Sequence, residues 1–291
     1  MRWRTFILLC VSFFIVAFSA GCRSSGEPDD SFVAEDRLHI RSAWSPDGRT
    51  IVFYHAGATG RGLYLIESDG TNMRMLYPGD GIGATWSPDN QWLAFSLTGN
   101  LYKIRVNGDS VTRISTSPGA VRPAWSRDGR RIAFVRGGTY VLDLQANMET
   151  DLFFMGDYPS WHPNFIDLVV QETIRDPVGI GGTYRFRAIN PNTLSLRTLH
   201  TFSSPDDCAF SSISPQGDAI IYGLKPYNSL TQVWKINLST GQHIRLTDDG
   251  GDYPAWSPDG RQIVYTRTEQ GDGGLWIMNA DGTGKRRLTR P

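Results

Sequence analysis

The sequence has few cysteines, no excess of either charge and no stretch with a sustained helical period. Its three cysteines, Cys10, Cys22 and Cys208, are too few for a scaffold held together by several disulfides. Basic and acidic side chains number 29 each, so the protein lacks the basic excess that would neutralise phosphates. We therefore expect no nucleic-acid partner. The missing helical period, in a sequence rich in aromatic and β-branched residues, excludes a mainly helical fold.

The N-terminal apolar run is too short to cross a membrane. It follows Arg2 and Arg4 and covers the thirteen residues 6–18, whereas a spanning helix needs about 20. This length is typical of the apolar region of a signal peptide. Small residues at 19–21 then precede Cys22, an arrangement that resembles the bacterial lipobox, although Ser19 stands where leucine is usual. The resemblance implies that Cys22 is lipidated; a secretory signal cleaved after Ala20 is the alternative.

Three segments follow from this organisation. We expect residues 1–21 to be a lipoprotein signal peptide, residues 22–37 to be the lipidated Cys22 with a polar, flexible tether, and residues 38–290 to fold. Several acyl chains on one cysteine would anchor the protein stably. The expected location is the bacterial cell envelope, exported and lipid-anchored, facing the periplasm or the cell surface.

A short motif recurs through the rest of the sequence. Trp-Ser-Pro-Asp-Gly occupies 44–48 and 256–260, and variants of it begin at 86, 125, 161 and 213, so that these six anchor positions lie 36 to 52 residues apart. Each period holds four short β-branched and aromatic runs, separated by turn signals such as Pro258-Asp259-Gly260. This pattern predicts an all-β fold, a six-bladed β-propeller with four antiparallel strands per blade.

The repeat resembles the PD40 (WD40-like) repeat of the TolB-like six-bladed propellers, over residues 38–290. The resemblance implies an envelope protein that binds other proteins, and its extension to an outer-membrane or secretion complex rests on that analogy alone. It does not extend to the α/β domain that precedes the propeller in TolB. Ring closure stays open: the first and last blades would pack face to face, unless Phe32-Val33 adds a strand.

The two faces of such a propeller differ in their expected roles. The repeated turns lie on one face, whereas the blade-to-blade connections and the loops between second and third strands vary and lie on the other, the longest loop being Ile174–Thr183. Because function tends to lie on loops held by a rigid scaffold, we expect an acidic channel mouth with scattered aromatics there, which binds a cation, a basic peptide segment or a sugar. The candidate residues are Asp80, Arg122, Asp157, Tyr158, Arg175, Asp176, Asp206, Asp207, Asp249, Asp252 and Tyr253.

Familiar catalytic and metal-binding motifs do not occur in the sequence. The histidines are scattered over different repeats, Cys208 stands alone, and the repeated aspartates suit turns better than calcium. We therefore expect no catalytic residue, no metal and no cofactor. The leading hypothesis is a monomeric, non-enzymatic module that binds an envelope protein or peptide. The alternative is a carbohydrate-binding or carbohydrate-cleaving propeller with carboxylates at the channel mouth.

Overall fold

The computed structural model describes residues 37–57, 60–177, 181–267 and 273–289. The expected signal peptide, Cys22 and nearly all of the expected tether lie outside the described residues, as does Phe32-Val33. The described part consists of strands, turns and loops, and it contains no helix able to span a membrane.

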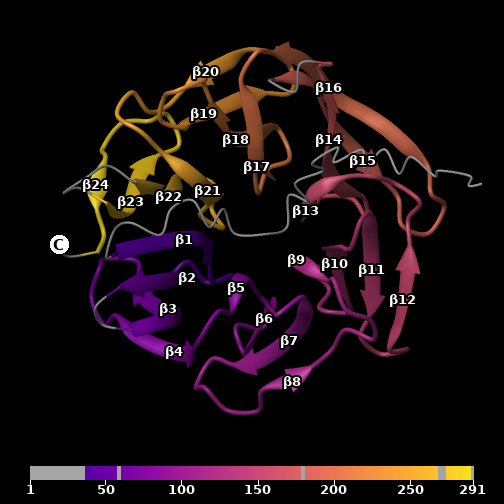
Figure 1. Cartoon of the computed structure of the whole chain (residues 1–291), viewed down its shortest axis with the longest axis vertical. Coiled ribbons are helices and arrows are strands. Elements are labelled where there is room, and N and C mark those ends of the chain that lie inside the picture. Colours follow the sequence, from indigo (N-terminus) through magenta and orange to yellow (C-terminus); the bar gives the residue numbers. More distant parts are fainter. Residues whose placement is uncertain (1–36, 58–59, 178–180, 268–272, 290–291) are drawn as a thin grey trace, which may run out of the picture.

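Six four-stranded antiparallel sheets stand around a central axis (Figure 1), each built from four consecutive strands. The strands of blades one to three are β1 (Arg37–Trp44), β2 (Thr50–Gly57), β3 (Gly60–Glu67), β4 (Arg74–Pro78), β5 (Ile82–Trp86), β6 (Trp92–Leu97), β7 (Asn100–Arg105), β8 (Thr112–Arg113), β9 (Val121–Trp125), β10 (Arg131–Val135), β11 (Thr139–Asp143) and β12 (Met148–Asp151). Those of blades four to six are β13 (Asp157–Trp161), β14 (Leu168–Arg175), β15 (Gly182–Ile189), β16 (Leu196–Ser204), β17 (Asp207–Ile213), β18 (Ala219–Lys225), β19 (Gln232–Asn237), β20 (His243–Arg245), β21 (Asp252–Trp256), β22 (Gln262–Arg267), β23 (Gly274–Asn279) and β24 (Arg286–Arg287). The predicted six-bladed propeller is confirmed.

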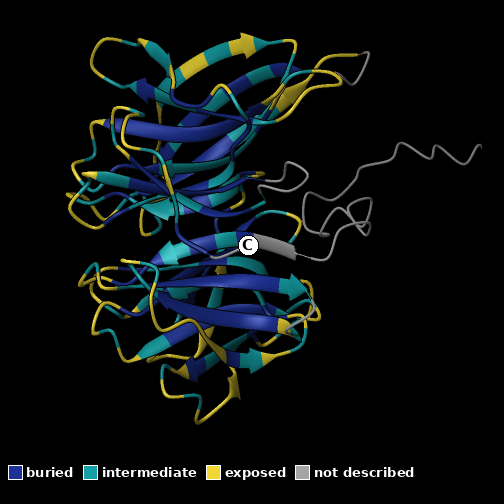
Figure 2. Ribbon diagram, turned by 90° about the vertical axis from the view of Figure 1, so that its left-hand side faces the viewer, coloured by how far each residue is buried: buried dark blue, intermediate teal, exposed yellow. Residues whose placement is uncertain are grey.

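The core consists of layers between neighbouring blades. The second strand of each blade holds a run of consecutive buried residues, so it reads as a continuous apolar run and not as an alternation. In β2, for example, Ile51, Val52 and Phe53 are all fully buried. Figure 2 shows this as dark blue middle strands between exposed outer strands and loops.

Three of the anchor tryptophans, Trp86, Trp161 and Trp256, join consecutive blades through their indole nitrogen. The indole Nε1 of Trp86 donates to the carbonyl of Ala43 (3.1 Å), and that of Trp161 donates to the carbonyl of Ala124 (2.9 Å). In both cases the acceptor belongs to the preceding blade, one residue before its own anchor. These tryptophans are therefore inter-blade core residues, and each adds a hydrogen bond to the packing.

Among the described residues, blades one and six close the ring by packing face to face. The sequence had left the manner of ring closure open. Trp44, Phe53 and Ile66 of blade one pack against Val264 and Ile277 of blade six in one buried cluster. The six described sheets share no strand.

Blade four accounts for the widest repeat spacing through longer strands. Arg175 at the end of β14 pairs with Gly182 at the start of β15, so Ile174, Arg175, Gly182 and Thr183 belong to the sheet. The prediction of a loop over Ile174–Thr183 was therefore too long, because strand pairing continues where the sequence suggested only turn residues.

Candidate functional site: the central channel

We call the two faces of the propeller the turn face, which carries the turns after the first and third strand of each blade, and the mouth face, which carries the other loops and the blade connections. On the turn face, one hydrogen-bonding pattern recurs. Ser126 donates to the carboxylate of Asp128 (2.6 Å) and its Oγ accepts the amide of Arg131 (2.9 Å), while Asp128 accepts the amide of Arg130 (3.0 Å). Equivalent bonds join Ser45 to Asp47, Ser87 to Asp89 and Ser257 to Asp259.

These aspartates are turn residues. The hydrogen bonds from Ser126 and Ser257 lower the pKa of Asp128 and of Asp259, and in Asp47 and Asp89 the same bonds outweigh the raising effect of partial burial, so that their pKa is lowered too. Within the part of the protein that the structure describes, no group of three or more His, Cys, Asp or Glu side chains is placed to hold a metal ion.

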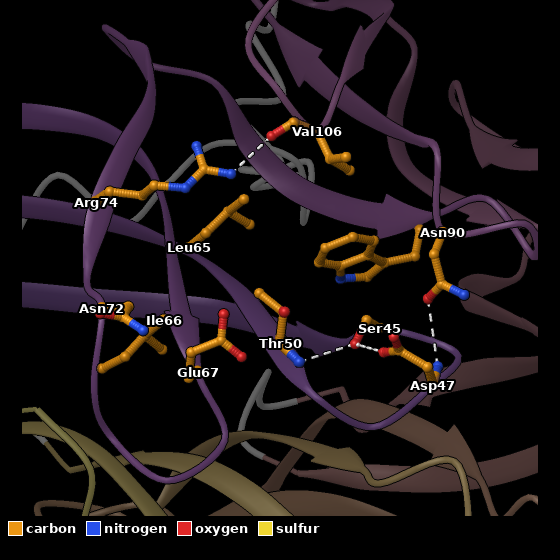
Figure 3. A pocket seen from close by; sticks show the side chains of 11 residues that line it. Ser45, Asp47, Thr50, Leu65, Ile66, Glu67, Asn72, Arg74, Asn90 and Val106 are labelled. Carbon is orange, nitrogen blue, oxygen red and sulfur yellow. Dashed lines mark hydrogen bonds between the residues drawn. The ribbon is translucent and has the colours of Figure 1, made fainter.

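A small cavity on the turn face lies in the seam between blades one and two (Figure 3). Its volume is about 200 Å³, below the range of about 300–1,000 Å³ typical of ligand pockets. The bonds that cross it hold the two blades together: Arg74 donates to the carbonyl of Val106 (2.8 Å), and the amide of Asp47 donates to Asn90 (3.3 Å). We regard it as a packing seam.

The innermost strands carry a shared irregularity that the sequence analysis missed. Three residues before each anchor the backbone adopts a positive φ of 49–62°, and the strand register shifts there. Such a bulge re-aims a side chain. The six residues at this position, which we call the channel ring, are Arg41, Gly83, Arg122, Tyr158, Phe210 and Tyr253.

The side chains of the channel ring contact one another across the blades. The rings of Phe210 and Tyr253 lie 4.0 Å apart between centroids, and those of Tyr158 and Phe210 lie 5.2 Å apart. The guanidinium of Arg122 lies 4.2 Å from the centroid of Tyr158, and that of Arg41 lies 6.0 Å from the centroid of Tyr253. The ring therefore combines two cations with three aromatic faces.

The two arginines of the channel ring differ in whether a carboxylate neutralises their charge. Arg122 forms an ion pair with Asp157, in which 9% and 18% of the two side chains are exposed. Burial lowers the pKa of Arg122, and the positive charge of Arg41 lowers it further. Arg41 makes no hydrogen bond or ion pair to the residues that the structure describes, and the Nε atoms of both arginines are buried without an acceptor.

Two aspartates next to the ring occupy equivalent positions but have different surroundings. Asp157 and Asp252 each accept the amide of the following tyrosine, at 3.0 and 2.9 Å. Burial raises the pKa of Asp252 to about 7, against lowering contributions from that amide, Lys225, Arg41 and Thr231. Near neutral pH, Asp252 is therefore neutral in a large fraction of molecules, whereas Asp157 faces the Arg122 guanidinium.

The other predicted site residues lie in the loops, connections and strand ends of the mouth face and are not members of the channel ring. Three of the acids are paired: Asp80 with Arg61 and with the Tyr54 hydroxyl, Asp207 with Arg175, and Asp249 with Arg267. Asp176 lies in the loop from β14 to β15, and Asp206 lies in the connection from β16 to β17. The pairing leaves the mouth less negative than the sequence suggested.

The structure brings His200 and His243 together, although their sequence spacing gave no sign of it. Their Nε2 atoms lie 3.2 Å apart in the seam between blades four and five, and the Tyr222 hydroxyl lies 2.6 Å from Nδ1 of His243. Burial lowers the pKa of both histidines. His162 stabilises its own turn, since Nδ1 accepts the amide of Asn164 (3.2 Å).

Cys208 is buried, and burial raises the pKa of its thiol. This lone cysteine belongs to the core between blades four and five.

Sequence reasoning assigned Arg122, Tyr158 and Tyr253 to the site and left out Arg41, Gly83 and Phe210. A signal was available, because all six ring residues stand three positions before an anchor. The reason for that spacing, the bulge at positive φ, is visible only in the folded strands.

Comparisons with known proteins support the fold. No protein-family model matches the sequence. A 119-residue part of it is 30% identical to an uncharacterized protein of Agrobacterium fabrum and covers 38% of this chain and 41% of that protein. A 95-residue part is 38% identical to the Tol-Pal system protein TolB of Gluconobacter oxydans and covers 28% of this chain and 21% of TolB. The matched parts thus span less than half of either relative.

Among solved structures, TolB from Acinetobacter baumannii superposes with a TM-score of 0.66 at 19% identity, covering 86% of this protein and 62% of that one. A component of a nidogen/laminin complex superposes with a TM-score of 0.60 at 11% identity, covering 87% and 93%. The fold is that of a TolB-like six-bladed propeller.

Proposed function

We propose that this TolB-like six-bladed propeller is a cell-envelope protein that docks a protein or peptide partner on its mouth face. The TolB-type fold and the export signal expected at residues 1–21 support the envelope location. Lipidation at Cys22 would tether the propeller to a membrane through residues 22–37. The protein would act by binding, without a catalytic step of its own.

The observation that carries this proposal is the exposure of large apolar side chains on the mouth face. Phe153, Met155 and Tyr227 are 83%, 77% and 73% exposed, the highest values among the large hydrophobic residues described. Phe153 and Met155 lie in the connection from β12 to β13, and Tyr227 lies in the loop from β18 to β19. Aromatic and methionine side chains are enriched where proteins meet, so this face suits a partner protein.

A chemical crosslinking experiment in cells tests the docking. The native protein is compared with the double variant F153S/M155S and with the control F165S, in which an exposed phenylalanine of the turn face is replaced. We expect a specific partner to be recovered with the native protein and with F165S, and to be lost with the double variant. Equal recovery with all three proteins would contradict docking on the mouth face.

Membrane tethering needs its own test. Growth with a labelled fatty acid should label the native protein and leave the variant C22S unlabelled. Labelling that persists in C22S, or its absence from both proteins, would contradict lipidation at Cys22.

One observation favours the carbohydrate-cleaving alternative, namely the pKa of Asp252 near 7, which suits a general acid. Glycoside hydrolysis also needs a second, facing carboxylate. The equivalent Asp157 is held by Arg122, and for that reason docking is the stronger proposal. Hydrolysis of a glycan by the native protein but not by D252N would reverse this order.

A further inference from the structure

The channel ring has one position without a side chain. Gly83 of β5 occupies it, between Arg41 of β1 and Arg122 of β9, and these three innermost strands follow one another around the axis in Figure 1. A Cβ atom placed on Gly83 would meet only Nη1 and Cδ of Arg41, at 3.8 and 3.9 Å. At Gly81, two residues earlier, the same atom would lie 2.9 Å from the ring of Phe95. The ring therefore has a gap that one guanidinium borders.

Positive charge accumulates beside this gap. Arg41 and Arg122 are close enough for the charge of one to lower the pKa of the other. Within the described ranges of the chain, only Arg122 of these two has an ion-pair partner, Asp157. The Nε atoms of both arginines are buried and have no acceptor among the described residues. The Arg122 side chain as a whole is only 9% exposed, so water does not readily supply one. Buried donors normally have partners, so this pair of unsatisfied donors points to an acceptor supplied from outside the propeller.

From this arrangement we infer that the gap beside Gly83 is a carboxylate-binding subsite, in which Arg41 and Arg122 receive a carboxylate group of the docked partner. The inference rests on the proposed function, because the partner supplies the group. A guanidinium binds a planar carboxylate through two parallel N–H···O bonds. Asp157 balances one arginine, whereas Asp252, with a pKa of about 7, offsets the charge of Arg41 only in part.

The neighbouring groups favour a monoanion over a phosphate. Asp157 and the partly ionised Asp252 lie next to the ring, and their negative charge would repel a dianion more strongly than a carboxylate. The aromatic faces of Tyr158, Phe210 and Tyr253 offer apolar contact to the carbon atoms attached to the carboxylate. The group could be the C-terminal carboxylate of a polypeptide or an acidic side chain, and the test separates these two sources.

Binding of small probes to the full-length protein tests the subsite directly. Sodium acetate is titrated against the protein while the Nε–Hε signals of arginine are followed by NMR, with acetamide as the neutral probe of the same shape. We expect two arginine signals to shift with acetate and not with acetamide. Absence of an acetate-specific shift in the native protein would overturn the inference.

Three variants locate the site. R41Q removes a guanidinium that has no ion pair to lose, and we expect acetate affinity to fall by about tenfold or more, as for a lost hydrogen bond between charged groups. G83Y places in the gap a side chain that the ring already accepts at the same backbone conformation in Tyr158 and Tyr253; it should abolish the acetate shifts. The control R61Q removes an exposed arginine of the rim and should bind acetate as the native protein does. Thermal unfolding confirms that each variant folds.

The source of the carboxylate follows from three peptides: acetyl-Ala-Ala-Ala with a free C-terminus, the same peptide as its amide, and acetyl-Ala-Glu-Ala amide. Binding of the first alone identifies a C-terminal carboxylate, and binding of the third identifies an acidic side chain. Either result supports the inference when R41Q weakens it, and affinities unchanged in R41Q and G83Y would overturn it.

The test does not depend on docking. If crosslinking finds no partner while acetate binds through Arg41, only the proposed function fails. If R41Q retains the partner at full affinity, the partner does not supply the carboxylate, and the inference fails while docking stands.

Discussion

On the turn face, aspartates such as Asp128 and Asp259 accept a serine hydroxyl and a backbone amide within their own turn. On the mouth face, Asp157 pairs with an arginine of the preceding blade, and Asp252 is buried enough for its pKa to reach about 7. The same residue type thus closes local turns on one face and takes part in long-range electrostatics on the other. Local hydrogen bonds repeat with the sequence motif, whereas the long-range contacts differ from blade to blade. The turn-face aspartates therefore stabilise the fold, whereas the mouth-face aspartates are not tied to a repeated turn.

The largest expected loss of stability comes from breaking a long-range ion pair of the mouth face. R122Q removes the positive charge beside the mostly buried Asp157, and loss of one partner of a buried pair costs about 3–5 kcal/mol. We expect the free energy of unfolding to fall by about 3 kcal/mol, measured by denaturant titration. The matched control R61Q removes one partner of a pair that is 60% exposed on both sides and should cost less than about 1 kcal/mol. Equal costs for the two variants would contradict the burial argument.

The second prediction breaks a turn on the other face. S126A deletes a buried hydroxyl that donates to Asp128 and accepts the amide of Arg131. We expect a loss of about 1–2 kcal/mol in the free energy of unfolding. S229A, on an exposed mouth-face loop, should change it by less than about 0.5 kcal/mol. Equal changes in the free energy of unfolding for S126A and S229A would contradict the structural role assigned to the repeated turns.

The third prediction concerns pH. The folded-state pKa of Asp252, about 7, lies above the ordinary value of 3.8, so the folded state binds more protons than the unfolded state between these values. The contribution of Asp252 to stability is therefore present below about pH 4 and is lost as the pH rises to about 7. D252N removes this loss. It should be more stable than the native protein at pH 8 by about 1 kcal/mol, a discounted figure because the side chain keeps partial contact with water.

Thermal or denaturant unfolding at pH 4, 6 and 8 measures the effect of D252N. The two proteins should have similar stability at pH 4 and diverge as the pH rises. A constant difference at all three pH values would show that Asp252 titrates normally in the folded protein.

The smallest effect on stability is expected for an exposed side chain of the mouth face, where binding and stability can be tested separately. F153S replaces a side chain that is 83% exposed, so its free energy of unfolding should stay within about 0.5 kcal/mol of the native value. We expect partner recovery by crosslinking to fall nonetheless. Stability and binding would then separate, with turn-face changes affecting the first and mouth-face changes the second. Loss of stability in F153S, with binding retained, would reverse that assignment.

Much of the fold follows from features that lie close together in the sequence. Leu275–Met278, for example, is one of the short apolar runs and lies within β23, and Pro258-Asp259-Gly260 forms the expected turn. These features are readable because a strand and a tight turn each depend on a few neighbouring residues. The closure of the ring between Trp44 and Val264 could not be read in this way, because it depends on packing between residues far apart in the sequence.

The candidate site was predicted only in part, for the same physical reason. Arg122, Tyr158 and Tyr253 were named because they lie in the blade connections and inner strands, but Gly83 and Phe210 were not. Nothing local marks Gly83 as a gap; it becomes one because the other five ring positions carry side chains that meet across the axis. His200 and His243 likewise meet only where blades four and five pack.

The number of blades, the turns and the buried middle strands can be read from the sequence alone. Each of them depends on turn residues and apolar runs that lie close together in the sequence and recur in every repeat. Tertiary structure alone decided which charges are paired and which are not. Arg122 forms an ion pair with Asp157, 35 residues away, while Arg41 has no ion-pair partner among the described residues. Electrostatic pairing depends on distance and burial in space, and six separate strands bring these groups together only when the ring closes.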